Sequence, residues 1–397
     1  MSFEWYPDKP YPEFSHIKSI SSQLDTQPTI LVAEALFITS SLLCLLHASQ
    51  TSKDLVVTWF AAIISGTAND VFFMVLPMVD NFWHAQCTIM LTPRLPLYIP
   101  LAYASFQYVG VACSRRLTGA KTLSKCAYAG LCSAIFYAAY DLVGAKFLWW
   151  SWHTTDAATV IRWCGVPVGS TMWTLVHVFV FTYILDLVVF SSTSSSFLKK
   201  FLEGGAATAL LTTPCMMLMM SPFQLHQLEV DFASLSIMQL PGKPDITAIS
   251  LVVATFGYLA NKGLRTGVAP VRWPDVMLFA TVIAHFVTLA LVLATGDPAS
   301  VKAAGLHQTI GDCDLKDYDL SGYERRKYLC NKKKHKEFQN HNQYFDVCGK
   351  VKDVDWFTIC GKGRVERRHL EGIAVLLLIG ISLFRILVVS KKRTKKA

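Results

Sequence analysis

Two ionisable side chains lie inside long apolar stretches of the sequence, and both are of types that perform acid–base chemistry. Asp141 lies eight residues before Trp149 in one apolar run, and His177 lies eleven residues after Val166 in the next. A charged group near the middle of a bilayer costs several kcal/mol and normally faces a partner or a watery cavity. Carboxylates and imidazoles are the usual general acids and bases of enzymes. We therefore predict Asp141 and His177 as catalytic acid–base residues.

Asp70 and His285 are expected at a similar depth in their own apolar stretches. At a rise of about 1.5 Å per residue, each of the four ionisable groups lies roughly 12 to 16 Å from the same end of its stretch. We expect Asp70 and His285 to support Asp141 and His177 in one polar cluster. Two other interpretations stay open: the groups only pair to hold helices together, or they bind a metal ion. The sequence lacks the HxxxH and HExxH spacings of common metal sites, so neither a metal nor a cofactor is predicted.

An aromatic and polar segment separates Asp141 from His177. Residues 149–163 hold four tryptophans, a histidine, an aspartate and an arginine. Such a segment is typical of the membrane–water interface, where tryptophan is enriched even without a ligand. Tyr137 and Trp173 share helical faces with Asp141 and His177 through i,i+4 spacing. The predicted substrate-binding residues are Asp70, Tyr137, Trp150, Trp152, His153, Asp156, Trp173 and His285.

A second polar segment, residues 80–96, is expected above the same cluster. It contains Asp80, His84 and Arg94. Together with Arg162, these residues are predicted to form the polar rim of a cavity that opens at the membrane surface. Their histidine and carboxylate groups are of the types that exchange protons with a bound molecule.

The chain as a whole has the composition of a polytopic membrane protein. Its 397 residues are 52% hydrophobic and only 16% charged, whereas soluble domains carry about 25% charged residues. A membrane span needs about 20 apolar residues. The predicted spans are 28–48, 55–79, 96–114, 126–148, 166–190, 204–223, 246–260, 274–295 and 371–390, of which 246–260 is the shortest. We therefore expect an all-α transmembrane helical bundle of nine spans.

Lysine and arginine residues alternate between the predicted interhelical loops. They concentrate after the third, fifth and seventh spans and in the final segment KKRTKKA, and such loops face the cytoplasm. The net charge of +9 therefore reflects topology, and no nucleic-acid partner is expected. The N-terminal segment lacks the basic and apolar regions of a cleavable signal peptide. The predicted domains are a lumenal or extracellular tail (1–27), eight spans (28–296), a lumenal cysteine-containing loop (297–370), a final span (371–390) and a basic cytoplasmic tail (391–397).

Four of the eleven cysteines lie in the one long predicted loop, at Cys313, Cys330, Cys348 and Cys360. In an oxidising lumen, four cysteines in a short segment indicate two disulfides that hold a small insert together. The sequence allows three pairings. Free thiols and a zinc site are alternatives, although no CxxC spacing occurs in this loop.

The segment around Asp141 resembles a known family. The residues Asp141, Gly144, Trp150-Ser151-Trp152, Gly165-Val166-Pro167 and Trp173 are similar to the pattern of the carotenoid hydratase family of integral membrane proteins. That pattern is an acid, an aromatic pair, a GVP turn and a following tryptophan across two spans, and the resemblance implies hydratase chemistry. This chain differs in its larger number of spans, its GSTMW after the turn and its cysteine-containing loop. The overall layout is also similar to eukaryotic multi-pass families without an assigned function, which implies no activity.

These features favour a protein that handles a lipid or an isoprenoid at a lumen-facing intramembrane site, with an acid–base enzyme as one form of that function. A transporter or channel could use the same intramembrane acids, although the inverted repeats common in transporters are not visible. A scaffold or receptor that binds a partner through the cysteine-containing loop is the third alternative. Membrane lipids and a small apolar ligand are the expected partners. The endoplasmic reticulum and the plasma membrane are both consistent with these features.

Overall fold

A bundle of long helices forms most of the structure, a computed structural model that describes residue 11 and residues 13–194, 196–224, 246–330, 344–349 and 355–390. The long helices are α2 (Pro28–Thr51), α3 (Lys53–Val75), α4 (Tyr98–Arg115), α5 (Thr122–Lys146), α7 (Val168–Leu185), α8 (Phe197–Gln224), α9 (Ile246–Leu264), α10 (Trp273–Thr295) and α12 (Arg367–Phe384). A π-helical turn, Asp186–Phe190, continues α7, and a 3-10 turn, Arg385–Leu387, continues α12.

Seven helices in the described part of the chain are long and apolar enough to cross a membrane. They are α2, α3, α5, α7 with its π-helical turn, α8, α10 and α12 with its 3-10 turn. The two other predicted spans, 96–114 and 246–260, correspond to α4 and α9, and both are helical. Nearly every side chain of α4 is buried by other parts of the protein. Few of them would contact lipid, so this helix can be less apolar than the others. The apolar part of α9 is shorter than in the other seven. The membrane character of the bundle is thus confirmed, and the count of nine spans stays a prediction.

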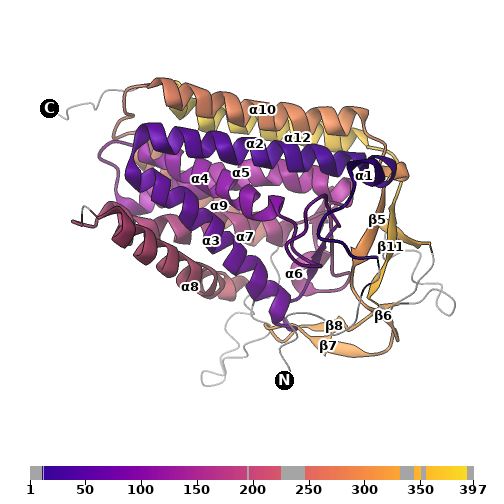
Figure 1. Ribbon diagram of the computed structural model, residues 1–397. Helices are drawn as coiled ribbons and strands as arrows, with labels where there is room; N and C mark the ends of the chain where they lie inside the picture. Colours follow the sequence, from indigo (N-terminus) through magenta and orange to yellow (C-terminus); the bar gives the residue numbers. More distant parts are fainter. Residues whose placement is uncertain are drawn as a thin grey trace, which may run out of the picture.

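Helix α5 lies at the centre of the bundle. It packs against α4, α7, α9, α10 and α12, and most of its side chains are buried. Helix α8 covers α3 and α7 on one side, and α2 packs between α4 and α10 (Figure 1). A serine joins two of the helices, because Ser52 ends α2 and caps α3 by accepting a hydrogen bond from the backbone N–H of Leu55. Such an N-cap satisfies a backbone donor that the helix leaves unpaired.

The loops after α3 and α5 and the segment before α12 form a cap over one end of the bundle, opposite the end at which α12 finishes (Figure 1). Its helical pieces are α1 (Ile20–Thr26), α6 (Ala157–Val160) and a 3-10 turn at Pro298–Ser300. Its antiparallel pairs are β1 (Phe82–His84) with β2 (Trp150–Trp152), β3 (Arg162–Trp163) with β4 (Val166–Pro167), and β7 (Lys316–Tyr318) with β8 (Glu324–Arg326). Strand β6 (Ile310–Gly311) pairs in parallel with β9 (Leu329–Cys330), and a three-stranded sheet has the order β10 (Phe345–Cys348), β11 (Trp356–Gly361), β5 (Lys302–Leu306).

The segment predicted as a separate lumenal loop, 297–370, shares its core with the helices. Val301, Ala303 and Phe357 belong to the same buried apolar cluster as residues of α2, α4 and α5. Strand β5 also contacts β1, so the cap is built jointly from this segment and from the loops after α3 and α5. The cap therefore has a fixed position over the helix ends.

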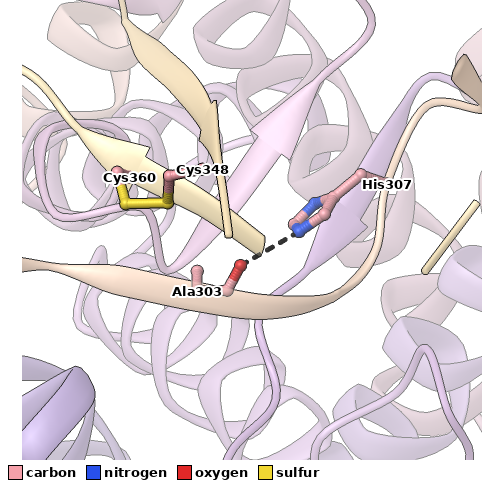
Figure 2. The surroundings of a disulfide bond; sticks show 4 residues. All are labelled: Ala303, His307, Cys348 and Cys360. Carbon is pink, nitrogen blue, oxygen red and sulfur yellow. Dashed lines mark hydrogen bonds between the residues drawn. A yellow bond between two sulfur atoms is a disulfide. The ribbon is translucent and has the colours of Figure 1, made fainter. Parts of the chain in front are cut away.

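Two of the four cysteines predicted to form disulfides are bonded to each other, and their bond joins two strands of the three-stranded sheet. Cys348 in β10 is bonded to Cys360 in β11, twelve residues apart (Figure 2). Cys313 is disulfide-bonded as well, whereas the side chain of Cys330 lies outside the described part of the structure. The same region holds His307, whose ring Nε2 lies 3.2 Å from the carbonyl oxygen of Ala303 (Figure 2).

Candidate functional site

A pocket with a cavity volume of about 170 Å³ lies between the cap and the ends of α3, α4, α5, α7 and α8. Its wall is mostly aromatic and apolar. The aromatic lining residues are Phe73, Phe82, Tyr103, Phe106, Tyr137, Tyr140, Trp150, Trp152, Trp173 and Tyr323, and three methionines of α8, Met216, Met217 and Met220, complete one side. A concave apolar pocket with few polar groups is the usual form of a small-molecule site.

The polar centre of this pocket is built around Asp70 of α3. The hydroxyl of Tyr103 donates to Asp70 Oδ1 at 2.6 Å, and Nε2 of His84 lies 3.3 Å from Asp70 Oδ2. Asn69 donates to the Tyr103 hydroxyl at 3.1 Å and accepts from Thr213 of α8 at 3.0 Å. All five side chains are buried. A buried carboxylate needs this kind of pairing, because an unpaired one loses its solvation without compensation.

Strand pairing places His84 at this centre. His84 lies in β1 opposite Trp150 of β2, which brings the loop after α3 and the loop after α5 together over the pocket. With Nε2–H donated to Asp70, the other ring nitrogen, Nδ1, is an acceptor, and it has no hydrogen-bond partner among the described residues. A carboxylate that holds one imidazole nitrogen while the other is free to take a proton is the arrangement of a general base.

The predicted acid Asp141 lies immediately behind the pocket wall. Ser170 of α7 donates to Asp141 Oδ2 at 2.6 Å, and Ser170 itself lines the pocket. Asp141 Oδ1 is buried and has no hydrogen-bond partner within the described chain. The carboxyl group therefore reaches the pocket through one serine hydroxyl. Gly144, one turn further along α5, allows Trp150 to pack closely against this helix, because a Cβ there would lie 2.2 Å from the ring of Trp150.

The other predicted catalytic residue, His177, lies one helical turn deeper than Trp173. Its Nε2 is 3.2 Å from the side-chain amide of Gln107, and its ring packs against Trp173 at a centroid distance of 4.8 Å. His177 is seven residues beyond Ser170 on α7, a rise of about 10 Å. It does not line the pocket, and no hydrogen bond joins it to Asp141 among the described residues.

His285 takes no part in the pocket. Its Nε2–H donates to the carbonyl oxygen of Phe136 at 3.1 Å, and its ring stacks on the Phe136 ring at 3.7 Å. These contacts hold α10 against α5. The four residues that the sequence placed at one depth therefore separate into one pocket residue, Asp70, one residue behind the wall, Asp141, and two residues in other helix contacts.

The predicted rim residues form ion pairs and hydrogen bonds that fasten the cap. Arg94 makes two hydrogen bonds to Asp80, at 2.6 and 3.0 Å. Arg162 donates to the backbone carbonyls of Thr159 and His153 and lies over the ring of Trp152. Burial lowers the pKa of Arg162 to about 10. These contacts fix the loops that carry β1 and β2, and with them His84.

A buried ion pair connects the β7–β8 hairpin to the pocket. Arg325 of β8 donates to Asp156 Oδ2 at 2.8 Å and to the backbone carbonyls of Pro77 and Asp80. Burial raises the pKa of Asp156, and the charge of Arg325 opposes that rise. Asp156 lines the pocket, so the hairpin is held directly above the site.

His153 is a neutral structural residue next to this ion pair. Burial, followed by the charges of Arg325 and Arg162, lowers the pKa of His153 to about 3. Its Nδ1 accepts hydrogen bonds from the backbone N–H groups of Thr155 and Asp156. His153 does not line the pocket, in contrast to its predicted role in substrate binding.

Several pocket residues were not predicted from the sequence. Asn69 is next to the predicted residue Asp70, and Ser170 lies in the GSTMW segment described above, so both are adjacent to sequence features already noted. Tyr103 and the three methionines carry no local signal that separates them from ordinary helix residues. The segment Asp319–Tyr323, the turn of the β7–β8 hairpin, covers the pocket with Leu320 and Tyr323, and nothing in its sequence indicates this position.

One family model spans both the helical bundle and the cap, which is consistent with the two parts forming one unit. A family model described as a domain of unknown function, DUF7802, matches residues 14–391. The chain belongs to the DUF7802 family. The match covers every helix and strand named above, the segment before α12 included. No curated protein and no solved structure matches the chain.

Proposed function

We propose that this DUF7802 protein is a membrane-embedded acid–base enzyme that acts on a lipid or an isoprenoid in the pocket beneath the cap. The observation that carries the proposal is the Asp70–His84 pair inside an aromatic pocket. Asp70 orients the imidazole through Nε2, Tyr103 fixes Asp70, and Nδ1 of His84 is left without a partner in the described structure. The aromatic wall provides the apolar contact area that a hydrocarbon chain needs.

His84 acts as the base in this proposal. A hydroxyl group or a water molecule in the pocket gives its proton to Nδ1, and the imidazolium that forms is stabilised by the carboxylate of Asp70. The low dielectric of the buried site strengthens this charge pair. Tyr103 keeps the carboxylate in place by donating to its other oxygen. Asp70 keeps the supporting role expected from the sequence, whereas the base is His84 in place of the expected His177.

Asp141 is the proposed acid, as the resemblance to carotenoid hydratases implies. In a hydration, Asp141 starts protonated and donates to the oxygen of Ser170, whose hydroxyl turns to give its own proton to one carbon of a double bond. Water adds to the other carbon and gives its proton to Nδ1 of His84. The double bond becomes a C–H and a C–OH bond with no net oxidation or reduction, and the two side chains return to their starting states through solvent. Trp150, Trp152 and Trp173 would stabilise the intermediate carbocation with their π-faces.

The proposed topology has nine spans with the cap in the lumen or outside the cell. Basic residues support this assignment, because they gather at the end of the bundle opposite the cap. Arg115 pairs there with Asp186, Arg116 with Asp275, and Lys200 with Asp54. Loops rich in lysine and arginine face the cytoplasm. The disulfide Cys348–Cys360 lies at the other end, as expected for an oxidising compartment.

Turnover of an isoprenoid probe tests the proposal. The purified protein in lipid nanodiscs is incubated with geranylgeraniol, retinol or squalene in ¹⁸O-water, and products are identified by mass spectrometry. We expect an ¹⁸O-containing hydration product from at least one probe. The variant His84→Gln should lose about 100-fold or more in rate, the usual contribution of a general base.

His16 offers a matched control, because it is an exposed histidine outside the pocket. The variant His16→Gln should keep the wild-type rate. The proposal fails if none of the three probes is converted, or if His84→Gln is as active as wild type. A transporter that used the same acids would instead show proton-coupled flux across proteoliposomes that depends on Asp70 without any chemical product.

A further inference from the structure

We propose that the pocket selects a lipid with an uncharged hydroxyl end and rejects lipids with phosphate or carboxylate ends. This inference rests on the proposed function, because it names the class of molecule that the same pocket takes. It concerns binding, however, and does not depend on whether the bound molecule is chemically changed.

The charges around the pocket disfavour an anionic ligand. None of the described residues that line it is a lysine or an arginine, whereas Asp70, Asp156 and Asp319 are all lining residues. Membrane proteins and soluble proteins alike bind phosphate and carboxylate groups mainly with the side chains of arginine and lysine. An anionic end in this pocket would face carboxylates in a low-dielectric site, where like charges repel strongly.

The nearby arginines do not change this balance, because each is already held by other groups. Arg94 is paired with Asp80, Arg325 with Asp156, and Arg162 donates to backbone carbonyls. Moving Arg325 toward a ligand would break a buried ion pair, which costs several kcal/mol, and moving Arg94 or Arg162 would break half-buried hydrogen bonds.

A cationic end is also poorly matched. Both oxygens of Asp70 accept hydrogen bonds, from Tyr103 and from His84. Asp156 is neutralised by Arg325. Asp319 accepts from the backbone N–H groups of Ser321 and Tyr323 within the hairpin turn. The carboxylates of the pocket are therefore used to build its wall and to orient His84.

Two lining residues have hydrogen-bonding atoms that a hydroxyl would satisfy. Within the described chain, Nδ1 of His84 and Nε1–H of Trp173 are buried without a partner. The first is an acceptor, given the donation of Nε2–H to Asp70, and the second can only donate. A hydroxyl donates and accepts, so one hydroxyl that lies between the two side chains satisfies both. Buried polar atoms of this kind are rarely left unpaired.

The rest of the pocket suits the hydrocarbon part of such a molecule. Phe73, Phe106 and Tyr137 form a wall on three different helices, and Met216 and Met220 face them from α8. Methionine side chains are flexible and adapt to irregular apolar shapes. The pocket therefore fits an isoprenoid alcohol better than a phospholipid or a prenyl diphosphate.

A chain-matched pair of probes tests the selectivity. Binding of radiolabelled geranylgeraniol to the purified protein in nanodiscs is measured directly, and unlabelled geranylgeraniol, geranylgeranyl diphosphate and geranylgeranylamine compete for it. These competitors have the same chain and differ only in the polar end. We expect the alcohol to compete at least tenfold better than the diphosphate and better than the amine. Equal or tighter binding of the diphosphate or the amine would overturn the inference, as would no saturable binding of geranylgeraniol.

A substitution at Trp173 tests the hydroxyl contact. Trp173→Phe removes the indole N–H but keeps an aromatic ring, and it should weaken geranylgeraniol binding about tenfold, the equivalent of one hydrogen bond. Binding of squalene, which has no hydroxyl, should weaken less than binding of geranylgeraniol, because squalene loses only ring contact area. Trp149→Phe is the matched control, because the Trp149 N–H already donates to Thr29 and the residue does not line the pocket.

Unchanged alcohol binding by Trp173→Phe would show that the N–H does not recognise the ligand and would refute this contact. The two proposals fail separately. Selective alcohol binding without any turnover would refute the enzyme and leave the selectivity, whereas turnover of a molecule with a charged end would refute the selectivity alone.

Discussion

Acid should loosen the cap through His153, and the size of the effect follows from the structure. Burial and the charges of Arg325 and Arg162 lower the pKa of His153 to about 3, from an ordinary value of 6.5. Above pH 6.5 the histidine is neutral in the folded and the unfolded chain, so it contributes nothing to pH dependence. Below that pH the unfolded chain takes up a proton that the folded chain excludes until about pH 3, so stability falls as the pH falls.

The expected loss at about pH 4.5 is about 3 kcal/mol for His153, because each pKa unit corresponds to about 1.36 kcal/mol. Burial also lowers the pKa of His307, to about 4. Its protonation in the unfolded chain therefore adds to the loss of stability at acid pH. Asp156 and Asp319 act in the opposite direction, since burial raises the pKa of each and acid then favours the folded state. The contribution of His153 is therefore read from a comparison of variants and not from the wild-type protein alone.

Thermal unfolding in nanodiscs, followed by tryptophan fluorescence, measures the effect at about pH 7.5 and about pH 4.5. The variant His153→Gln cannot take up a proton, so its acid-induced loss of Tm should be smaller than that of wild type by on the order of 5 °C. The exposed His16 provides the control, and His16→Gln should behave as wild type. Equal acid sensitivity of His153→Gln and wild type would refute the assignment of His153 as a buried neutral residue.

Two further predictions concern packing and covalent bonds. Gly144→Ala would place a Cβ 2.2 to 2.9 Å from ring atoms of Trp150, so it should destabilise the protein by about 1 to 3 kcal/mol in chemical denaturation. Gly257→Ala, which meets no atom within 4 Å, is the matched helix control and should stabilise by up to about 1 kcal/mol; equal effects of the two would contradict the packing. Loss of the Cys348–Cys360 bond in Cys348→Ser should lower stability by about 3 kcal/mol, given the twelve-residue separation, and an unchanged Tm would show that the bond does not constrain the cap.

The sequence by itself determined the membrane helices, because their signal is local. Apolar composition over about 20 residues is sufficient to predict a spanning helix, and the predicted segments 126–148 and 274–295 agree with α5 and α10 within a few residues at each end. The aromatic residues Trp150, Trp152 and Trp173 were predicted as substrate-binding residues, and all three line the pocket.

Only the tertiary structure decided which polar residues meet. Depth in a helix is readable from the sequence, but the face that a residue presents and the helix that it meets depend on packing. His285 thus reaches a backbone carbonyl of α5 while Asp70, at a similar depth, reaches Tyr103 of α4. His84 becomes the partner of Asp70 through the pairing of two three-residue strands, which are too short to leave a periodic signal.

The position of the β7–β8 hairpin over the pocket could not be predicted from the sequence for the same reason. Leu320 and Tyr323 cover the pocket because Arg325 reaches Asp156, which is 169 residues away in the chain. Such a long-range pairing depends on the positions of the helix ends in the packed bundle. Local composition determined that the chain crosses a membrane with acids inside it, whereas long-range packing determined that one aspartate and one histidine share a pocket.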